Sequence, residues 1–168
     1  DNFSVYFHTE KPEQKVLLEM TGLNLSDYRN MGGCEHALVD TLLGANGKFT
    51  RIDFAVDLFD TGGLPHDMLN CWLCSQVATV AQSVQLIERV SREKSAGATL
   101  YIGSRSSERF IRIYEKGKQK NLDVDWIRVE LEAKGDRAIQ MGSLMVVGGI
   151  ERAGVRMLGD AVEWTDVD

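Results

Sequence analysis

Three segments of the chain alternate between apolar and polar residues over most of their length, most cleanly the first of them. A period of two is typical of a β-strand that turns one face to the core and the other to solvent. In the first segment the apolar positions are Ile52, Phe54, Val56 and Leu58. The pattern therefore predicts strands with one apolar and one polar face, over residues 50–59, 109–115 and 126–134.

The remaining pattern predicts shorter strands and several helices around these segments. β-prone runs predict strands over 4–8, 15–20 and 99–103, and apolar residues at helical spacing predict helices over 34–43, 65–77, 137–145 and 150–162. We expect Asp136 to be the N-cap of the third helix, and residues 78–93 fit either period. Hairpin-like strand spacing indicates an α+β fold, a single domain over 1–168, with a mostly antiparallel sheet and helices on one face.

The polar faces of the three alternating segments carry an unusual set of side chains. Each face includes an arginine together with carboxylates or a tyrosine. If the strands are neighbours, the carboxylates lie close together and repel one another unless a cation compensates them. The polar positions are Arg51, Asp53 and Asp57 in the first segment, Arg112, Tyr114 and Lys116 in the second, and Arg128, Glu130, Glu132 and Lys134 in the third.

Two interpretations of these polar faces remain open. One is a divalent metal site in which Mg²⁺ or Mn²⁺ is favoured because all the ligands are oxygens. The other is a set of cross-strand salt bridges between the arginines and the acids on a solvated sheet surface. In either case the arginines could bind phosphate oxygens in a bidentate way.

Tyr114 differs from the other tyrosines in its surroundings. It lies between Arg112 and Lys116 on a face that also carries carboxylates, whereas Tyr6, Tyr28 and Tyr101 lack such neighbours. A phenol is a weak nucleophile until nearby cations or a metal favour the phenolate. The alternative role for Tyr114 is ordinary amphipathic packing.

Composition limits the classes of partner. The chain of 168 residues has a net charge of −6, which argues against non-specific wrapping of duplex DNA but does not exclude nucleic acid. No apolar run reaches the ~20 residues that span a bilayer, so no membrane partner is expected. The sequence begins without Met or a signal segment, and we expect a cytoplasmic fragment of a longer protein.

The number and spacing of the cysteines favour a packing role over a disulfide framework. Three cysteines exclude a complete intramolecular disulfide framework. Cys71 and Cys74 are expected to pack as small hydrophobic residues on a helix.

Four motifs, in this order along the chain, resemble the replication initiation factor family. That family includes rolling-circle plasmid initiators, relaxases of conjugative elements and replication proteins of filamentous phages. The resemblance runs from about residue 22 to 134 and is specific as a set. Its motifs are Arg-x-Asp-x-x-x-Asp at 51–57, Thr-x-Tyr-x-Gly-x-Arg-x-Ser at 99–107, Arg-x-Tyr-x-Lys at 112–116 and Trp-x-Arg-x-Glu at 126–130.

The resemblance implies a role for each residue that matches these motifs. It implies a fold similar to that of HUH nickases, with the active site on the open sheet face and a topology that can be permuted. The histidine pair of those enzymes is absent, and the carboxylates of Glu130 and Glu132 have the same i, i+2 spacing. The implied catalytic residues are Tyr114, Lys116 and Arg112, the implied metal ligands are Asp53, Asp57 and Glu130, with Glu132 a weaker candidate, and the implied DNA phosphate contacts are Arg51, Arg105 and Arg128.

The activity that the resemblance implies is metal-dependent nicking and rejoining of single-stranded DNA at an origin. Tyr114 would form a 5′-phosphotyrosyl intermediate, with Mg²⁺ or Mn²⁺ as cofactor and origin DNA and a host helicase as partners. Two alternatives stay open: a sequence-specific DNA-binding module that does not cut, and a metal-dependent phosphodiesterase that uses water. The origin sequence, the plasmid, conjugative-element or phage source, and the oligomeric state stay undetermined.

Overall fold

The computed structural model of this chain describes residues 3–7, 9–11, 15–61, 63–75, 77–90 and 95–164. The chain divides into two compact units, 1–47 and 48–168. No helix in the described part of the chain is long and apolar enough to cross a membrane.

The first unit contains a small hairpin and two helices. Strands β1 (Ser4–Tyr6) and β2 (Leu17–Glu19) pair antiparallel, and helices α1 (Gly22–Asn30) and α2 (Glu35–Gly44) follow. The apolar pattern predicted α2 but missed α1, because α1 buries no residue and has no apolar stripe. A capping box starts α1 instead: the Thr21 side chain accepts a hydrogen bond from the Asn24 N–H, and the Asn24 side chain accepts one from the Thr21 N–H.

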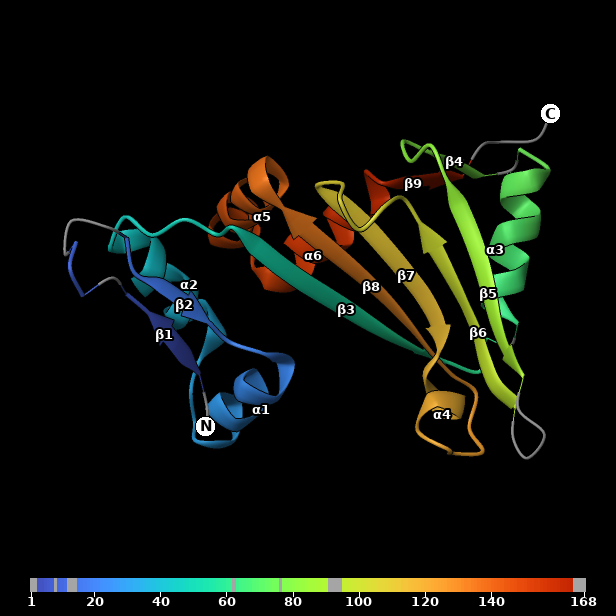
Figure 1. The fold of residues 1–168 in the computed structure, drawn as a ribbon, viewed down its shortest axis with the longest axis horizontal. Helices are drawn as coiled ribbons and strands as arrows, with labels where there is room; N and C mark the ends of the chain where they lie inside the picture. Colours follow the sequence, from blue (N-terminus) through green and yellow to red (C-terminus); the bar gives the residue numbers. More distant parts are fainter. Residues whose placement is uncertain are drawn as a thin grey trace. The chain divides into compact units, whose positions relative to one another are not determined.

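The second unit is built on a five-stranded sheet in which every pair of neighbours is antiparallel (Figure 1). The spatial order is β3-β8-β7-β6-β5, so β8 lies between β3 and β7. The strands are β3 (Arg51–Phe59), β5 (Val84–Val90), β6 (Ser95–Ile102), β7 (Arg109–Glu115) and β8 (Trp126–Lys134).

Three helices pack against the apolar face of this sheet. Helix α3 (Leu64–Leu73) contacts β5, β6 and β7, and helix α5 (Gly135–Gly148) contacts β3 and β8. Helix α6 (Ile150–Gly159) packs on α5 and approaches Phe54 of β3. The predicted α+β class, antiparallel sheet and helical face are confirmed. The largest fully buried side chains of this layer are Pro65, Leu100, Ile127, Leu131, Met141 and Met157.

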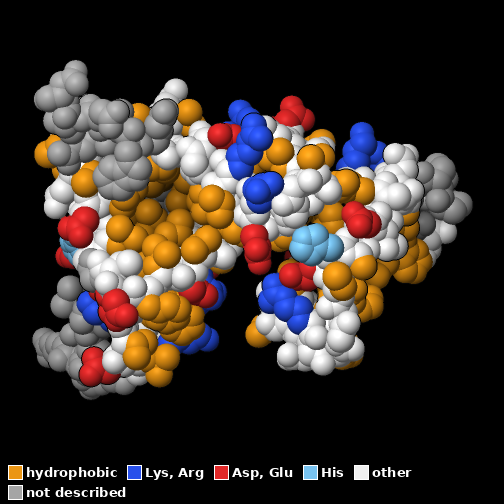
Figure 2. All heavy atoms as spheres, turned by 180° about the vertical axis from the view of Figure 1, so that it is seen from behind, with side chains coloured by type: hydrophobic (Ala, Val, Ile, Leu, Met, Phe, Trp, Pro, Cys, Tyr) orange, Lys and Arg blue, Asp and Glu red, His pale blue; other side chains and the backbone are white. Residues whose placement is uncertain are grey.

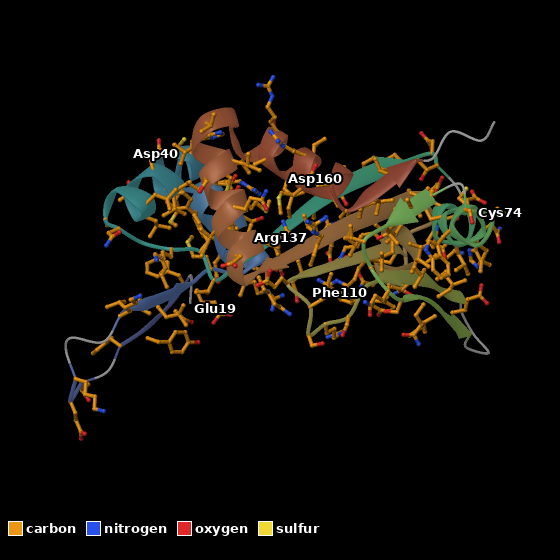
Figure 3. All side chains as sticks on the ribbon, turned by 90° about the horizontal axis from the view of Figure 1, so that it is seen from above. Glu19, Asp40, Cys74, Phe110, Arg137 and Asp160 are labelled. Carbon is orange, nitrogen blue, oxygen red and sulfur yellow. The ribbon has the colours of Figure 1, made fainter. Side chains whose placement is uncertain are left out.

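The opposite face of the sheet, called the open face, carries the polar side chains: those of β3 are exposed, and those of β8 and β7 are half-buried or buried. Seen from above, Phe110 of β7 lies on the open side of the strands, whereas Asp160 at the end of α6 lies on the helical side (Figure 3). In the view from behind, hydrophobic side chains gather over part of the second unit (Figure 2). The two faces of the sheet therefore differ in chemistry as the alternation predicted.

Several boundaries differ from the pattern-based expectation. Helix α3 ends at Leu73, because residues 77–79 form β4 (Val77–Thr79) and pair with β9 (Val162–Trp164). This pairing joins segments far apart in sequence, so no local period could show it. The ambiguous stretch 78–93 contains β5, whose partner is β6. A short helix, α4 (Lys116–Gln119), follows β7 directly.

Two smaller expectations are also corrected. The N-cap of α5 is Lys134, and Asp136 lies in the first helical turn, where its charge favours the helix N-terminus. All three cysteines are free. Cys71 is half-buried in α3, but Cys74 is the exposed C-cap and does not pack in the core.

Gly154 allows α6 to approach the sheet closely. A Cβ atom at this position would lie 2.3 Å from carbon atoms of the Phe54 ring. We expect Gly154→Ala to lower the free energy of unfolding by about 1–3 kcal/mol because the ring or the helix must shift. Urea unfolding measures the difference.

Gly159→Ala is the matched control in the same helix. A Cβ there meets nothing within 4 Å, so the change should be neutral or stabilising by up to about 1 kcal/mol. Equal stability of the two variants would contradict the close packing of α6 on β3.

Candidate functional site

The register of the sheet brings the three predicted polar faces together. Tyr114 of β7 and Asp57 of β3 are both cross-strand partners of Arg128 in β8, and these three residues are called the tyrosine row. One pleat further along, Glu130 of β8 lies opposite Arg112 of β7 and Ala55 of β3. The predicted adjacency of the acids, the arginines and Tyr114 is confirmed.

Tyr114 is held by a carboxylate and lies beside cations. Its Oη donates a hydrogen bond to Glu130 Oε1 at 2.7 Å, and Glu130 Oε2 pairs with Arg112 Nη2 at 2.8 Å. The Lys116 Nζ donates to the Tyr114 Oη at 3.4 Å and lies over the same ring. The phenol oxygen therefore has a proton acceptor on one side and an ammonium group on another.

Asp57 lies at the other end of the tyrosine row. It accepts two hydrogen bonds from Arg128, from Nε to Oδ1 and from Nη2 to Oδ2, each at 2.7 Å. The Trp126 Nε1 donates to the same Oδ1 at 2.7 Å. The hydrogen bond from Arg128 is the main reason that the pKa of Asp57 lies below its usual value. Asp57 is therefore ionised near neutral pH, and it fixes the orientation of both Arg128 and Trp126.

A second ion-pair group lies toward the start of β3. Arg51 donates to both oxygens of Asp53, at 2.8 and 2.7 Å, and to Glu132 Oε2 at 2.7 Å. Lys134 also pairs with Glu132, which is the only buried charged residue in the described part of the chain. Two cations around this carboxylate compensate the cost of burying it.

The carboxylates predicted as metal ligands are divided among arginine partners. Asp53 pairs with Arg51, Asp57 with Arg128, and Glu130 with Arg112. Within the described residues, no group of three or more His, Cys, Asp or Glu side chains could hold a metal ion. The cross-strand salt bridges of the alternative interpretation are present, and each of the three acids is paired with an arginine in this arrangement. The metal site stays a prediction.

Burial is the main reason that the pKa of Tyr114 is raised well above its ordinary value. The hydrogen bond to Glu130 and the charge of Glu130 raise it further, and the charges of Arg128 and Arg112 lower it only in part. The surrounding cations were expected to favour the phenolate, and the net effect is the opposite. Tyr114 is therefore a protonated phenol at neutral pH, so a nucleophilic attack needs a base to take its proton.

Two other predicted site residues, Lys116 and Arg105, reach this face from outside the strands. Lys116 is not part of β7 but the first residue of α4, and burial lowers the pKa of its ammonium group. Arg105 lies in the turn between β6 and β7, and its guanidinium lies 5.9 Å from the centre of the Phe110 ring. Tyr101 stacks on the same ring and has no recorded contact with the acids.

Arg112 retains an unused donor. Its Nε is buried and has no hydrogen-bond partner in the described part of the structure. A buried donor without an acceptor costs about 1–3 kcal/mol.

Two aromatic residues of this face were not among the predicted site residues. Trp126 and Phe59 are cross-strand partners at one end of the β3–β8 pair, and their rings stack with centroids 5.8 Å apart. Strand parity could have found both, since Trp126 lies two residues before Arg128 and Phe59 two residues after Asp57. Their contact with each other depends on the register of the two strands.

The sheet and its open face define a class of protein: an α+β domain whose tyrosine lies among arginines and carboxylates on the uncovered side of an antiparallel sheet. The model of the replication initiation factor family matches residues 47–167. The chain belongs to this family. The match covers the whole five-stranded sheet and the helices that pack on it.

Two further proteins are similar to the chain. "Putative DNA relaxase NicK" of Bacillus subtilis (strain 168) is 22% identical over 192 residues, covering 100% of this chain and 52% of the relative. The solved structure of the rolling circle replication initiator protein from Geobacillus stearothermophilus has a TM-score of 0.80 at 22% identity, covering 99% of this chain and 65% of that one. The chain thus spans about half the length of the relaxase, and the likeness to the solved structure confirms the fold.

The Glu130 carboxylate should control the acidity of Tyr114. We expect Glu130→Gln to lower the pKa of Tyr114 toward its ordinary value, because the charge and the strong acceptor are lost while burial remains. NMR titration of ¹³C-labelled tyrosine measures it, with the Tyr114 signal assigned by its loss in Tyr114→Phe.

Glu132→Gln is the control, since Glu132 pairs with Arg51 and Lys134 and not with Tyr114. Glu132→Gln should leave the pKa of Tyr114 unchanged from that of the unmodified protein. An unchanged titration in Glu130→Gln would show that the hydrogen bond between the two side chains is absent in solution.

Proposed function

We propose that this chain nicks and rejoins single-stranded DNA to initiate replication or strand transfer, with Tyr114 as the nucleophile. The observation that carries the proposal is the hydrogen bond from Tyr114 Oη to Glu130, flanked by Arg112, Arg128 and Lys116 on an open sheet face. Membership of the replication initiation factor family and the names of the two similar proteins support it.

In the proposed reaction Glu130 is the general base. The phenol is protonated at neutral pH, and Glu130 Oε1 already accepts its hydrogen bond at 2.7 Å. As Tyr114 Oη attacks the phosphorus atom, its proton passes to Glu130. The salt bridge from Arg112 Nη2 to Glu130 Oε2, at 2.8 Å, holds the carboxylate with its Oε1 directed at the phenol.

The cations around Tyr114 are proposed to hold the phosphate that is attacked. Arg128 is the cross-strand partner of Tyr114, Lys116 Nζ lies 3.4 Å from the Tyr114 Oη, and Arg112 pairs with the Glu130 that accepts the phenol's hydrogen bond. Charge that develops on the phosphate oxygens during the in-line attack is stabilised by such fixed donors. Arg51 and Arg105 lie further along the same face and are proposed to contact neighbouring phosphates.

The proposed reaction is a transesterification, in which one phosphoester bond replaces another. A bond forms between Tyr114 Oη and phosphorus, the bond from phosphorus to the 3′ oxygen breaks, and that oxygen leaves as a 3′-hydroxyl after taking a proton from Lys116 or water. The phosphotyrosyl link conserves the energy of the broken bond. The reverse attack by a 3′-hydroxyl rejoins the strand and returns the proton to Tyr114.

Tyr114→Phe tests the nucleophile. We expect no covalent adduct between this variant and labelled single-stranded DNA, because the attacking oxygen is missing, and a loss of stability of only about 1 kcal/mol from the missing hydrogen bond. A denaturing gel detects the adduct. Tyr101→Phe, on the neighbouring strand of the same face, should form it normally.

Three results would count against the nucleophile assignment. An adduct formed by Tyr114→Phe would place the nucleophile elsewhere. Cleavage by the unchanged protein without an adduct would indicate a phosphodiesterase that uses water. Binding without cleavage would indicate a DNA-binding module.

A divalent cation is also proposed, from the family resemblance and from the carboxylates of Asp53, Asp57 and Glu130. No step above depends on it. A cation would compete with Arg128 for Asp57 and with Arg112 for Glu130, so we expect its binding without DNA to be weak. A bound Mg²⁺ or Mn²⁺ would act as a Lewis acid on the phosphate.

Calorimetric titration with Mn²⁺ tests the cation directly. Asp53→Ala, Asp57→Ala and Glu130→Ala should each weaken binding about tenfold or more, because a charged oxygen ligand is lost. Glu151→Ala, on α6 and away from the open face, is the control. Equal affinity in all four variants would remove these acids from the metal site.

A further inference from the structure

The end of the open face beside the tyrosine row carries a stacked aromatic pair. Phe59 and Trp126 are cross-strand partners, with ring centroids 5.8 Å apart and planes inclined by 25°. Phe59 is 60% exposed, although it ends a strand whose apolar positions face the helices. A large planar apolar surface is therefore presented to solvent on the face that carries the proposed nucleophile.

The pair is fixed by the same groups that surround Tyr114. The indole Nε1 of Trp126 donates to Asp57, which also binds Arg128. The Arg128 guanidinium lies 5.6 Å from the centre of the Trp126 ring. The aromatic surface and the phosphate-binding arginine thus form one rigid assembly.

The aromatic pair lies two residues along the strands from the tyrosine row. Trp126 precedes Arg128 by two residues in β8, and Arg128 is the cross-strand partner of Tyr114. Two residues of a strand span about 7 Å. A phosphate at Tyr114 therefore places the base attached to a neighbouring sugar within reach of Phe59 and Trp126.

We propose that Phe59 and Trp126 form a stacking platform for an unpaired nucleobase next to the phosphate that Tyr114 attacks. The inference rests on the proposed function and specifies how that site holds its substrate. An exposed ring that flanks cations matches a strand of phosphates and unpaired bases, since aromatic stacking and positive charge together bind single-stranded nucleic acid. A base inside a duplex offers no free face, so the platform selects single strands.

The alternative occupant is a second copy of this chain, which would cover the exposed Phe59 with its own apolar surface. The arginines and Lys116 beside the platform favour a polyanion over another copy of the same cationic cluster. The state of association is included in the test.

The test uses the full chain with Tyr114→Phe, so that binding is measured without reaction. Two probes of about 12 nucleotides are compared by fluorescence anisotropy: a mixed-sequence DNA single strand, and the same backbone with abasic sugars throughout. We expect the intact strand to bind more tightly than the abasic strand. Adding Phe59→Ala should weaken binding of the intact strand about 5- to 100-fold and leave the abasic strand unchanged.

Two further variants separate stacking from general effects. Phe59→Leu keeps an apolar side chain without a ring and should lose most of the same affinity. Tyr6→Ala removes an aromatic residue that is 52% exposed in the first unit and should change neither probe. Thermal unfolding checks that each variant is folded.

Equal weakening of both probes by Phe59→Ala, or no weakening, would overturn the platform. Equal binding of the two probes by the Tyr114→Phe protein would also overturn it. A dimer that Phe59→Ala converts to a monomer in sedimentation would overturn it as well. The adduct assay on the protein with Tyr114 intact is independent. A missing adduct with a preserved base preference would count against the nicking chemistry and not against stacking.

Discussion

The pairing of β8 with β3 on one side and β7 on the other is the constraint on which the site depends. The hydrogen bonds that link Tyr114 to Glu130 and Arg128 to Asp57 each cross one of these two interfaces. A slip of one residue would turn Arg128 and Glu130 toward the helices and leave Tyr114 without its acceptor. The buried side chains of Ile127 and Leu131 prevent that slip, because it would bring them to the open face. The hydrophobic core thus fixes the register, and the register fixes the chemistry.

Pairing of acids with arginines on the open face determines the orientation and the charge of the groups around Tyr114. The acids of β3 and β8 bind arginines, so the half-buried surface tolerates its many charges without a cation. The arginines are oriented by these pairs and not free to move, which lowers the entropy that a bound phosphate must restrict. Burial and Glu130 raise the pKa of Tyr114 and keep its phenol protonated, and in the proposed reaction Glu130 takes the proton. The proposed phosphate contacts and the proposed activation of the phenol therefore depend on one network of hydrogen bonds and ion pairs.

The division of the sheet into two faces separates stability from substrate contact. On one face, helices α3, α5 and α6 bury apolar side chains, and Gly154 lets α6 lie close to Phe54. On the other face lie the paired arginines and the exposed Phe59. A long polymer can lie along such a surface, whereas a closed pocket would admit only a small molecule. The stacked aromatic pair at one end is the part of that surface proposed to bind an unpaired base.

The sequence by itself determined the three alternating strands, their polar faces and the side of the sheet on which Tyr114 lies, because side-chain direction follows from local backbone periodicity. Motif order also indicated the family. Tertiary structure decided the rest. The strand order made Arg128 the neighbour of both Asp57 and Tyr114, and burial together with Glu130 raised the pKa of Tyr114 where charge counting had suggested the reverse. The β4–β9 pair and the Phe59–Trp126 stack were equally beyond local patterns. Distances between strands, and the dielectric surroundings of a side chain, arise only when segments remote in sequence pack together.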